Sequence, residues 1–90
     1  MRGTNGGMLR GMGYDVSVVA VLRSSPKAHF LDVLADRFEA LEHAPGSKTV
    51  KITEHVSVSD EADARAFVQS LVLDALPDGS TISDVTVTSD

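Results

Sequence analysis

Two segments of the chain carry their apolar residues in a single stripe at helical spacing, and strand-like segments precede and follow each of them. The stripe within residues 26–43 consists of Phe30, Leu31, Leu34, Phe38 and Leu41. A second stripe, which starts after Asp60, consists of Ala64, Phe67, Val68, Leu71, Val72 and Ala75. A helix with one apolar stripe buries it against a single neighbouring layer. We therefore expect two helices on one face of a sheet, with Phe30, Phe38 and Phe67 in the core.

Capping and turn residues support these positions. Ser25 is expected as the N-cap of the first helix and Pro26 as its first residue, and "HAPGS" (43–47) is expected to end that helix. Asp60 and Asp63 form a capping-box-like pair that predicts the start of the second helix. The sequence "PDGS" (77–80) predicts a turn before a last alternating strand, "TISDVTVTSD".

The sequence "YDVSVVAVLR" (14–23) predicts a strand at the centre of the sheet. Val19 and Val21 lie on one of its faces beside polar residues. The other face carries Tyr14, Val16, Val18, Ala20 and Leu22. A strand that is apolar on both sides at its middle is usually flanked by two other strands.

Residues 48–59 decide the topology, because Glu54 interrupts an alternation that is otherwise typical of a strand. Two short strands, 48–52 and 56–59, with Glu54 in a turn between them, give the order β-α-β-β-α-β of a ferredoxin-like plait. One strand with a bulge at Glu54 gives a three-stranded relative of that plait, and one regular strand gives parallel strands with helical crossovers. The plait or its bulged relative is favoured, which makes the predicted fold α+β, a two-layer α/β sandwich.

Composition narrows the domain organisation and the classes of function. The 90-residue chain holds no cysteine, which excludes disulfides and thiolate metal sites, and its net charge of −5 argues against nucleic acids and anionic membranes as partners. We expect one domain over residues 14–90. The Gly-rich residues 1–13 are expected to be a flexible leader or a docking arm with apolar contacts at Met8, Leu9 and Met12.

None of the polar residues forms a recognisable catalytic or ligand-binding motif. The three histidines, His29, His43 and His55, lack the spacing of a metal-binding pair. Glu54 and His55 are candidates for a site at the irregular strand, although neighbours on a strand point to opposite sides. We therefore predict no enzyme activity, no catalytic residue, no cofactor and no metal.

The preferred hypothesis is a non-enzymatic module that assembles with itself or with a larger protein partner. An open sheet face with Val19 and Val21 at its centre is typical of a contact surface. Residue usage is typical of a GC-rich genome, and no apolar run approaches the length of a membrane span. We therefore expect an accessory or structural protein of a bacterium or its phage, located in the cytoplasm or within an intracellular particle.

The order of the predicted elements and the length of the chain are similar to those of small plait subunits. Examples are the small subunit of formylglycinamidine ribonucleotide synthase and the ACT-type regulatory domains. This similarity lies in the pattern and assigns no functional residue. It implies an alternative function, that of a regulatory or enzyme-complex subunit that binds a metabolite at a dimer interface.

Overall fold

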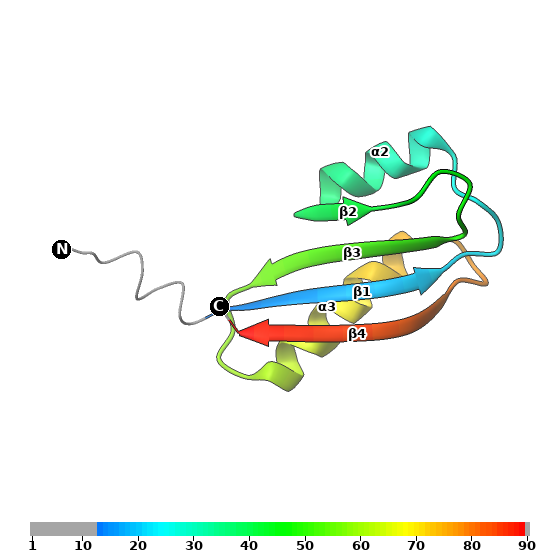
Figure 1. The fold of residues 1–90 in the computed structure, drawn as a ribbon. Helices are drawn as coiled ribbons and strands as arrows, with labels where there is room; N and C mark the ends of the chain where they lie inside the picture. The colour runs from blue at the N-terminus through cyan, green and yellow to red at the C-terminus, as the bar shows by residue number, and fades with distance from the viewer. Residues whose placement is uncertain (1–12, 90) are drawn as a thin grey trace.

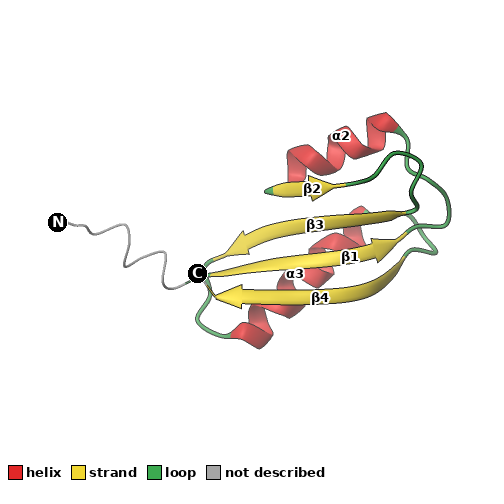
Figure 2. Ribbon diagram, in the orientation of Figure 1, coloured by secondary structure: helices red, strands yellow, loops and turns green. Residues whose placement is uncertain are grey.

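The computed structural model describes residues 13–89, which form a small α+β fold (Figures 1 and 2). Four antiparallel strands make one open sheet with the order β2-β3-β1-β4, and two helices accompany it. The elements in chain order are β1 (Tyr14–Val21), α2 (Ala28–Arg37), β2 (Ala40–Glu42), β3 (Thr49–Val56), α3 (Glu61–Ala75) and β4 (Thr81–Ser89). Residues 1–12, which include the proposed contacts Met8, Leu9 and Met12, lie outside the described residues.

β1 is central in the sheet, as its sequence predicts, and it carries the middle of the core. Val16, Val18 and Ala20 are 0% exposed. Figure 1 shows α3 crossing one face of the sheet behind β3, β1 and β4, while α2 lies beside the short strand β2. Buried side chains of both helices join the inward side chains of the strands in one hydrophobic cluster. The fold therefore has two layers, and the other face of the sheet has no helix over it among the described residues.

The first helix is shorter than predicted, because its last predicted turn forms a strand instead. α2 ends at Arg37, and Phe38 already has extended backbone angles. Leu41 continues the helical stripe of Leu34 and Phe38, but it lies equally well opposite Ile52 in the β2–β3 ladder. So few apolar residues cannot distinguish the period of a helix, about 3.6 residues, from the period of a strand, 2 residues. Pairing with the neighbouring strand decides the outcome, as it often overrides local propensity.

The sequence "HAPGS" closes a hairpin between β2 and β3, whereas it was expected only to end a helix. Gly46 has φ 80°, and the Ser47 N–H donates to the Ala44 carbonyl at 3.0 Å. Pro45 followed by a glycine of positive φ is the signature of a type II turn. The extra strand that a four-stranded sheet requires therefore comes from residues 40–42 and not from a split of residues 48–59.

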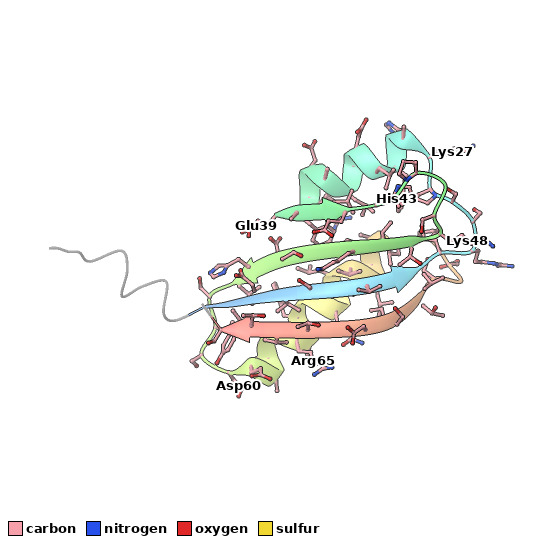
Figure 3. All side chains as sticks on the ribbon, in the orientation of Figure 1. Lys27, Glu39, His43, Lys48, Asp60 and Arg65 are labelled. Atoms are coloured by element: carbon pink, nitrogen blue, oxygen red, sulfur yellow. The ribbon has the colours of Figure 1, made fainter. Side chains whose placement is uncertain are left out.

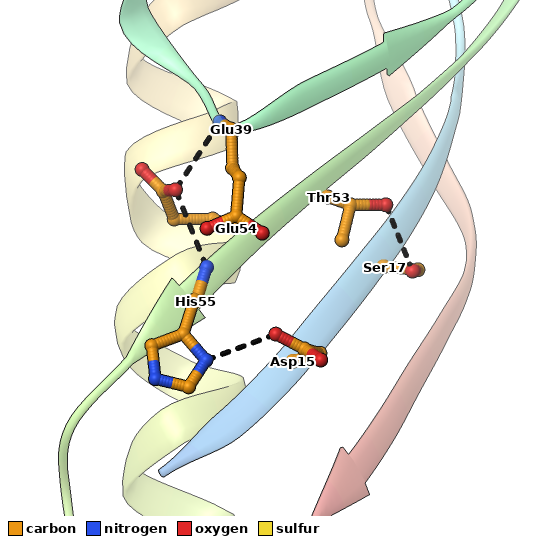
Figure 4. Close-up of polar contacts among 6 residues, drawn as sticks. All are labelled: Asp15, Ser17, Glu39, Thr53, Glu54 and His55. Atoms are coloured by element: carbon orange, nitrogen blue, oxygen red, sulfur yellow. Dashed lines mark hydrogen bonds and ion pairs between the residues drawn. The ribbon is translucent and has the colours of Figure 1, made fainter. Parts of the chain in front are cut away.

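Glu54 breaks neither the strand nor its register, contrary to both favoured readings of the sequence. β3 runs unbroken from Thr49 to Val56, and Glu54 lies opposite Val16 in a continuous ladder with β1. The Glu54 carboxylate accepts a hydrogen bond from the Glu39 N–H and another from the His55 N–H, each at 3.2 Å (Figure 4). The β2–β3 ladder reaches only to Thr53. The carboxylate thus binds backbone donors at the point where the neighbouring strand begins, which accounts for a charge on the apolar side.

The irregularity of the sheet lies in β4, not in β3. Between Val19 and Ala20 of β1 the partner changes from Asp84 to Ile82, so Ser83 is an extra residue in the ladder. The Ser83 hydroxyl donates to the Val19 carbonyl at 3.3 Å. In a regular strand Ile82 and Val85, three residues apart, would point to opposite faces. Because Ser83 is an extra residue, both point to the core face, and so does Val87.

Helix α3 matches its predicted start but buries a narrower stripe than expected. Asp60 is its N-cap and accepts a hydrogen bond from the Asp63 N–H at 3.1 Å. The expectation that Phe67 belongs to the core is wrong, because Phe67 is 54% exposed while Phe38 is 6% exposed. The buried residues Ala64, Val68 and Val72 are smaller and face the sheet directly, which leaves Phe67 on the flank of the stripe. Neither described helix is long and apolar enough to cross a membrane.

Replacing Glu54 by Ala removes the acceptor for two backbone N–H groups, and we expect the free energy of unfolding to fall by about 1–2 kcal/mol. Glu54→Gln keeps a side-chain oxygen and is expected to lose less. Urea denaturation followed by circular dichroism measures both changes. Asp36→Ala, on the exposed side of α2, removes a charge without removing such an acceptor. Equal losses in all three variants would contradict the role of the carboxylate.

Candidate functional site

The open face of the sheet carries Val19 and Val21, as the sequence predicts for these interface candidates. Both side chains are half-buried. In the two ladders of β1, Val19 lies between Lys51 and Asp84. Val21 lies between Thr49 and Thr81, so the rows on either side of the two valines are polar or charged. At the centre of this face the apolar area is therefore limited to the two valines.

Glu54 and His55 point to opposite sides of β3 and do not form a pair of side chains. The His55 Nδ1 contacts the Asp15 Oδ1 at 2.9 Å across the ladder, on the open face (Figure 4). The two side chains are 27% and 43% exposed, and ion pairs of such exposure contribute only about 0–1 kcal/mol. A Cβ on Gly13 would collide with the His55 ring, so the backbone of Gly13 supports the ring from one side.

An Asp–His pair beside a serine resembles part of a catalytic triad, which needs the serine hydroxyl bonded to the imidazole. Here the Ser17 hydroxyl and the Thr53 hydroxyl bond to each other at 3.0 Å. This pattern is that of cross-strand pairs that stabilise a sheet. Among residues 13–89 no three His, Cys, Asp or Glu residues lie together as a possible metal site.

A pocket of about 460 Å³ opens at the end of the sheet where β1 ends, α2 begins and the turn before β4 passes. Its volume lies in the range of about 300–1,000 Å³ that is usual for small-molecule sites. Two stretches of the chain that are distant in sequence contribute its lining, residues 22–30 and residues 77–78. The lining residues are Leu22, Arg23, Ser24, Ser25, Pro26, Lys27, His29, Phe30, Pro77 and Asp78.

The rim of this pocket is more basic than the chain as a whole. Arg23 and Lys27 line it together with one acid, Asp78, whereas the whole chain has 13 acidic residues and 8 basic ones. The Arg23 side chain lies over Gly79, where a Cβ would collide with its Cγ and Cδ. Gly79 has φ 88°, a conformation that glycine adopts without steric cost. The turn therefore fixes the stem of Arg23 at the mouth of the pocket.

Helix α2 begins beside the pocket without a capping side chain. Its N-cap is Lys27, which makes no side-chain capping hydrogen bond, and its first turn holds no acid. Ser25, the expected cap, lies two residues before Lys27 and lines the pocket instead. The first N–H groups of a helix carry partial positive charge when no cap neutralises it. This charge adds to that of the Lys27 ammonium group.

Charge is unevenly distributed along the strands. Lys27 and Lys48 lie at the end of the molecule where β1 ends and β3 begins, and Glu39 and Asp60 lie toward the opposite end (Figure 3). The Leu22 N–H donates to the Lys48 carbonyl at 2.8 Å, which ties the two strand ends together. The basic end is therefore also the end that holds the pocket.

No sequence pattern indicates the pocket, because its lining residues are explained by a helix start and a turn. "SSPK" is a helix start and "PDGS" is a turn, and neither pattern indicates a ligand. No family model, no curated protein and no solved structure matches the chain significantly. The interpretation of function therefore rests on the geometry.

Two glycines of positive φ provide a matched test of how the pocket is built. We expect Gly46→Ala to lower the free energy of unfolding by about 1–2 kcal/mol, since only the backbone conformation opposes it and nothing lies within 4 Å of the added Cβ. Gly79→Ala is expected to cost more, because its Cβ must also displace Arg23. In an Arg23→Ala background the two costs should become equal in urea denaturation. An unchanged difference would exclude the contact between Arg23 and Gly79.

Proposed function

We propose that the protein is a non-enzymatic assembly module that pairs with a second copy of itself along β4. The observation that carries this proposal is the position of β4, a strand of nine residues at the edge of the sheet. Within the described residues β4 pairs only with β1. The N–H and C=O groups on its outer side are a template for another strand.

The two edges of the sheet differ in how well they are protected. β2 has only three residues and carries a glutamate, Glu42. β4 contains no proline, no lysine and no arginine, and its one charged residue is Asp84. Natural proteins protect edge strands by shortening them, by charging them or by bulges. β2 follows the first two of these, whereas β4 has a bulge only at Ser83 and is left with a regular segment, 84–89, beyond it.

The inward side chains of β4 add an apolar component to this edge. Ile82, Val85 and Val87 are only partly buried, whereas the inward residues of β1 beside them are fully buried. A strand added to β4 would cover the exposed parts of these three side chains. It would also supply hydrogen-bond partners for the N–H and C=O groups on the outer side of β4. Burial of apolar surface supplies most of the free energy in such associations.

A second copy of the chain fits this edge without opposing like charges. In an antiparallel pair with its two-fold axis at Thr86, Val85 lies opposite Val87 of the second copy and Asp84 lies opposite Thr88 of the second copy. Two-fold pairs of this kind are the commonest arrangement of homo-oligomers. The same surface thus supplies both halves of the interface.

The order of elements and the strand order β2-β3-β1-β4 support the assignment of the fold to the ferredoxin-like plait. A plait leaves one sheet face and two edges available for contacts. The open face offers the candidates Val19 and Val21, but Lys51 and Asp84 beside Val19 would have to be desolvated in a face-to-face pair. We therefore assign the interface to the β4 edge.

We expect the full chain to be a dimer in native mass spectrometry and in light scattering coupled to size exclusion. The variant Thr86→Lys places two lysines directly opposite each other at the two-fold axis of the pair and should convert the dimer into a folded monomer. Thr49→Lys, an exposed threonine of β3, is the control and should remain dimeric. Circular dichroism verifies that each variant is folded.

A monomeric wild-type chain at every concentration would contradict this proposal. A dimer that survives Thr86→Lys but is lost in Val19→Lys would move the interface to the open face. Deletion of residues 1–12 tests the docking arm. An unchanged oligomeric state after this deletion would exclude the arm from the interface.

A further inference from the structure

We infer that the pocket at the end of β1 binds a small organic anion, a molecule with an apolar or aromatic body and one carboxylate or phosphate group. The pocket lies within one chain, so this binding goes beyond the proposed pairing through β4 and does not depend on it. The inference rests on the shape, the lining and the charge of the pocket together.

The interior of the pocket suits an apolar body. Leu22 is almost fully buried and Phe30 is partly buried, and both belong to or pack on the hydrophobic core. Pro26 and Pro77 contribute further apolar surface without side-chain hydrogen-bonding groups. Pockets of this kind bind ligands mainly by removing apolar surface from water, and a few polar groups fix the orientation.

The mouth of the pocket suits one negative charge. Arg23 and Lys27 both line it, and Asp78 is the one acid there. A guanidinium group binds a carboxylate or a phosphate through two parallel hydrogen bonds, and an ammonium group adds a point charge. In a chain of net charge −5, two cations at the mouth of its pocket favour an anion where the rest of the surface repels it.

The chain positions the stem of Arg23 and the backbone of Lys27 before any ligand binds. The stem of Arg23 lies over Gly79, and Lys27 is the N-cap residue of α2. The hydrogen bond from Leu22 to Lys48 fixes the strand end from which Arg23 projects. Groups that are already oriented lose less conformational entropy when they bind a ligand.

Titration of the ¹⁵N-labelled full chain with benzoate, phenyl phosphate, benzamide and inorganic phosphate tests the inference. We expect benzoate or phenyl phosphate to shift the amide signals of residues 22–25, 27–30 and 78–79. Benzamide has the same body without the charge and is expected to bind several-fold more weakly, since an exposed ion pair contributes about 0.2–1 kcal/mol. Which of the two anions binds more tightly distinguishes a carboxylate site from a phosphate site.

Arg23→Gln and Lys27→Gln are each expected to weaken binding of the preferred anion about two- to five-fold, the range that one exposed ion pair supplies. Arg65→Gln removes the same charge from α3, away from the pocket (Figure 3), and should leave binding unchanged. Because Arg23→Gln and Lys27→Gln each remove one cation from the mouth of the pocket, either one tests the inference if the other unfolds. The dispersion of the amide spectrum shows which are folded.

Three outcomes would overturn the inference. The first is that no anion of the series shifts the signals of the pocket residues. The second is equal weakening in Arg65→Gln, which would indicate a general effect of net charge. The third is binding of inorganic phosphate as tight as that of phenyl phosphate, which would mean that the apolar interior takes no part.

Discussion

The structure depends on the burial of β1 between two strands and beneath α3. Both helices of residues 13–89 lie on one face, so the strands beside β1 must bring their apolar residues to the same side of the sheet. β3 does so in a regular register. β4 does so only because Ser83 shifts its alternation by one residue. The polar residues of these strands consequently lie on the open face, where Asp15 bonds to His55 and Ser17 bonds to Thr53.

The elements that the sequence predicts correctly are those in which one periodicity or one capping residue has no competitor. β1 alternates over its whole length, Asp60 caps α3, and "PDGS" forms a turn in which the Ser80 N–H donates to the Pro77 carbonyl. Residues 38–42 are different, because Leu41 satisfies both a helical stripe and a strand. Residues 40–42 form a strand because β3 lies beside them and pairs with them. The residues near Leu41 in the sequence do not show that β3 will lie there.

The candidate site was predictable only in part, for a related reason. Glu54 is conspicuous in the sequence as a charge among apolar residues, but its partners are backbone N–H groups that no pattern displays. Asp15 meets His55 only through the register of β1 against β3. The pocket joins residues 22–30 to residues 77 and 78, which the chain brings together across two helices and two strands. Contacts of this kind follow from topology and not from spacing.

Lys27 and Lys48 lie at one end of the strands, and Glu39 and Asp60 lie toward the other. In the antiparallel pair that we propose, the basic end of one copy would lie beside the acidic end of the other. Each copy also carries a net charge of −5, so two copies repel each other at a distance. Because ions screen this repulsion over about 8–10 Å at ordinary salt concentration, the encounter of two chains would become faster as salt rises.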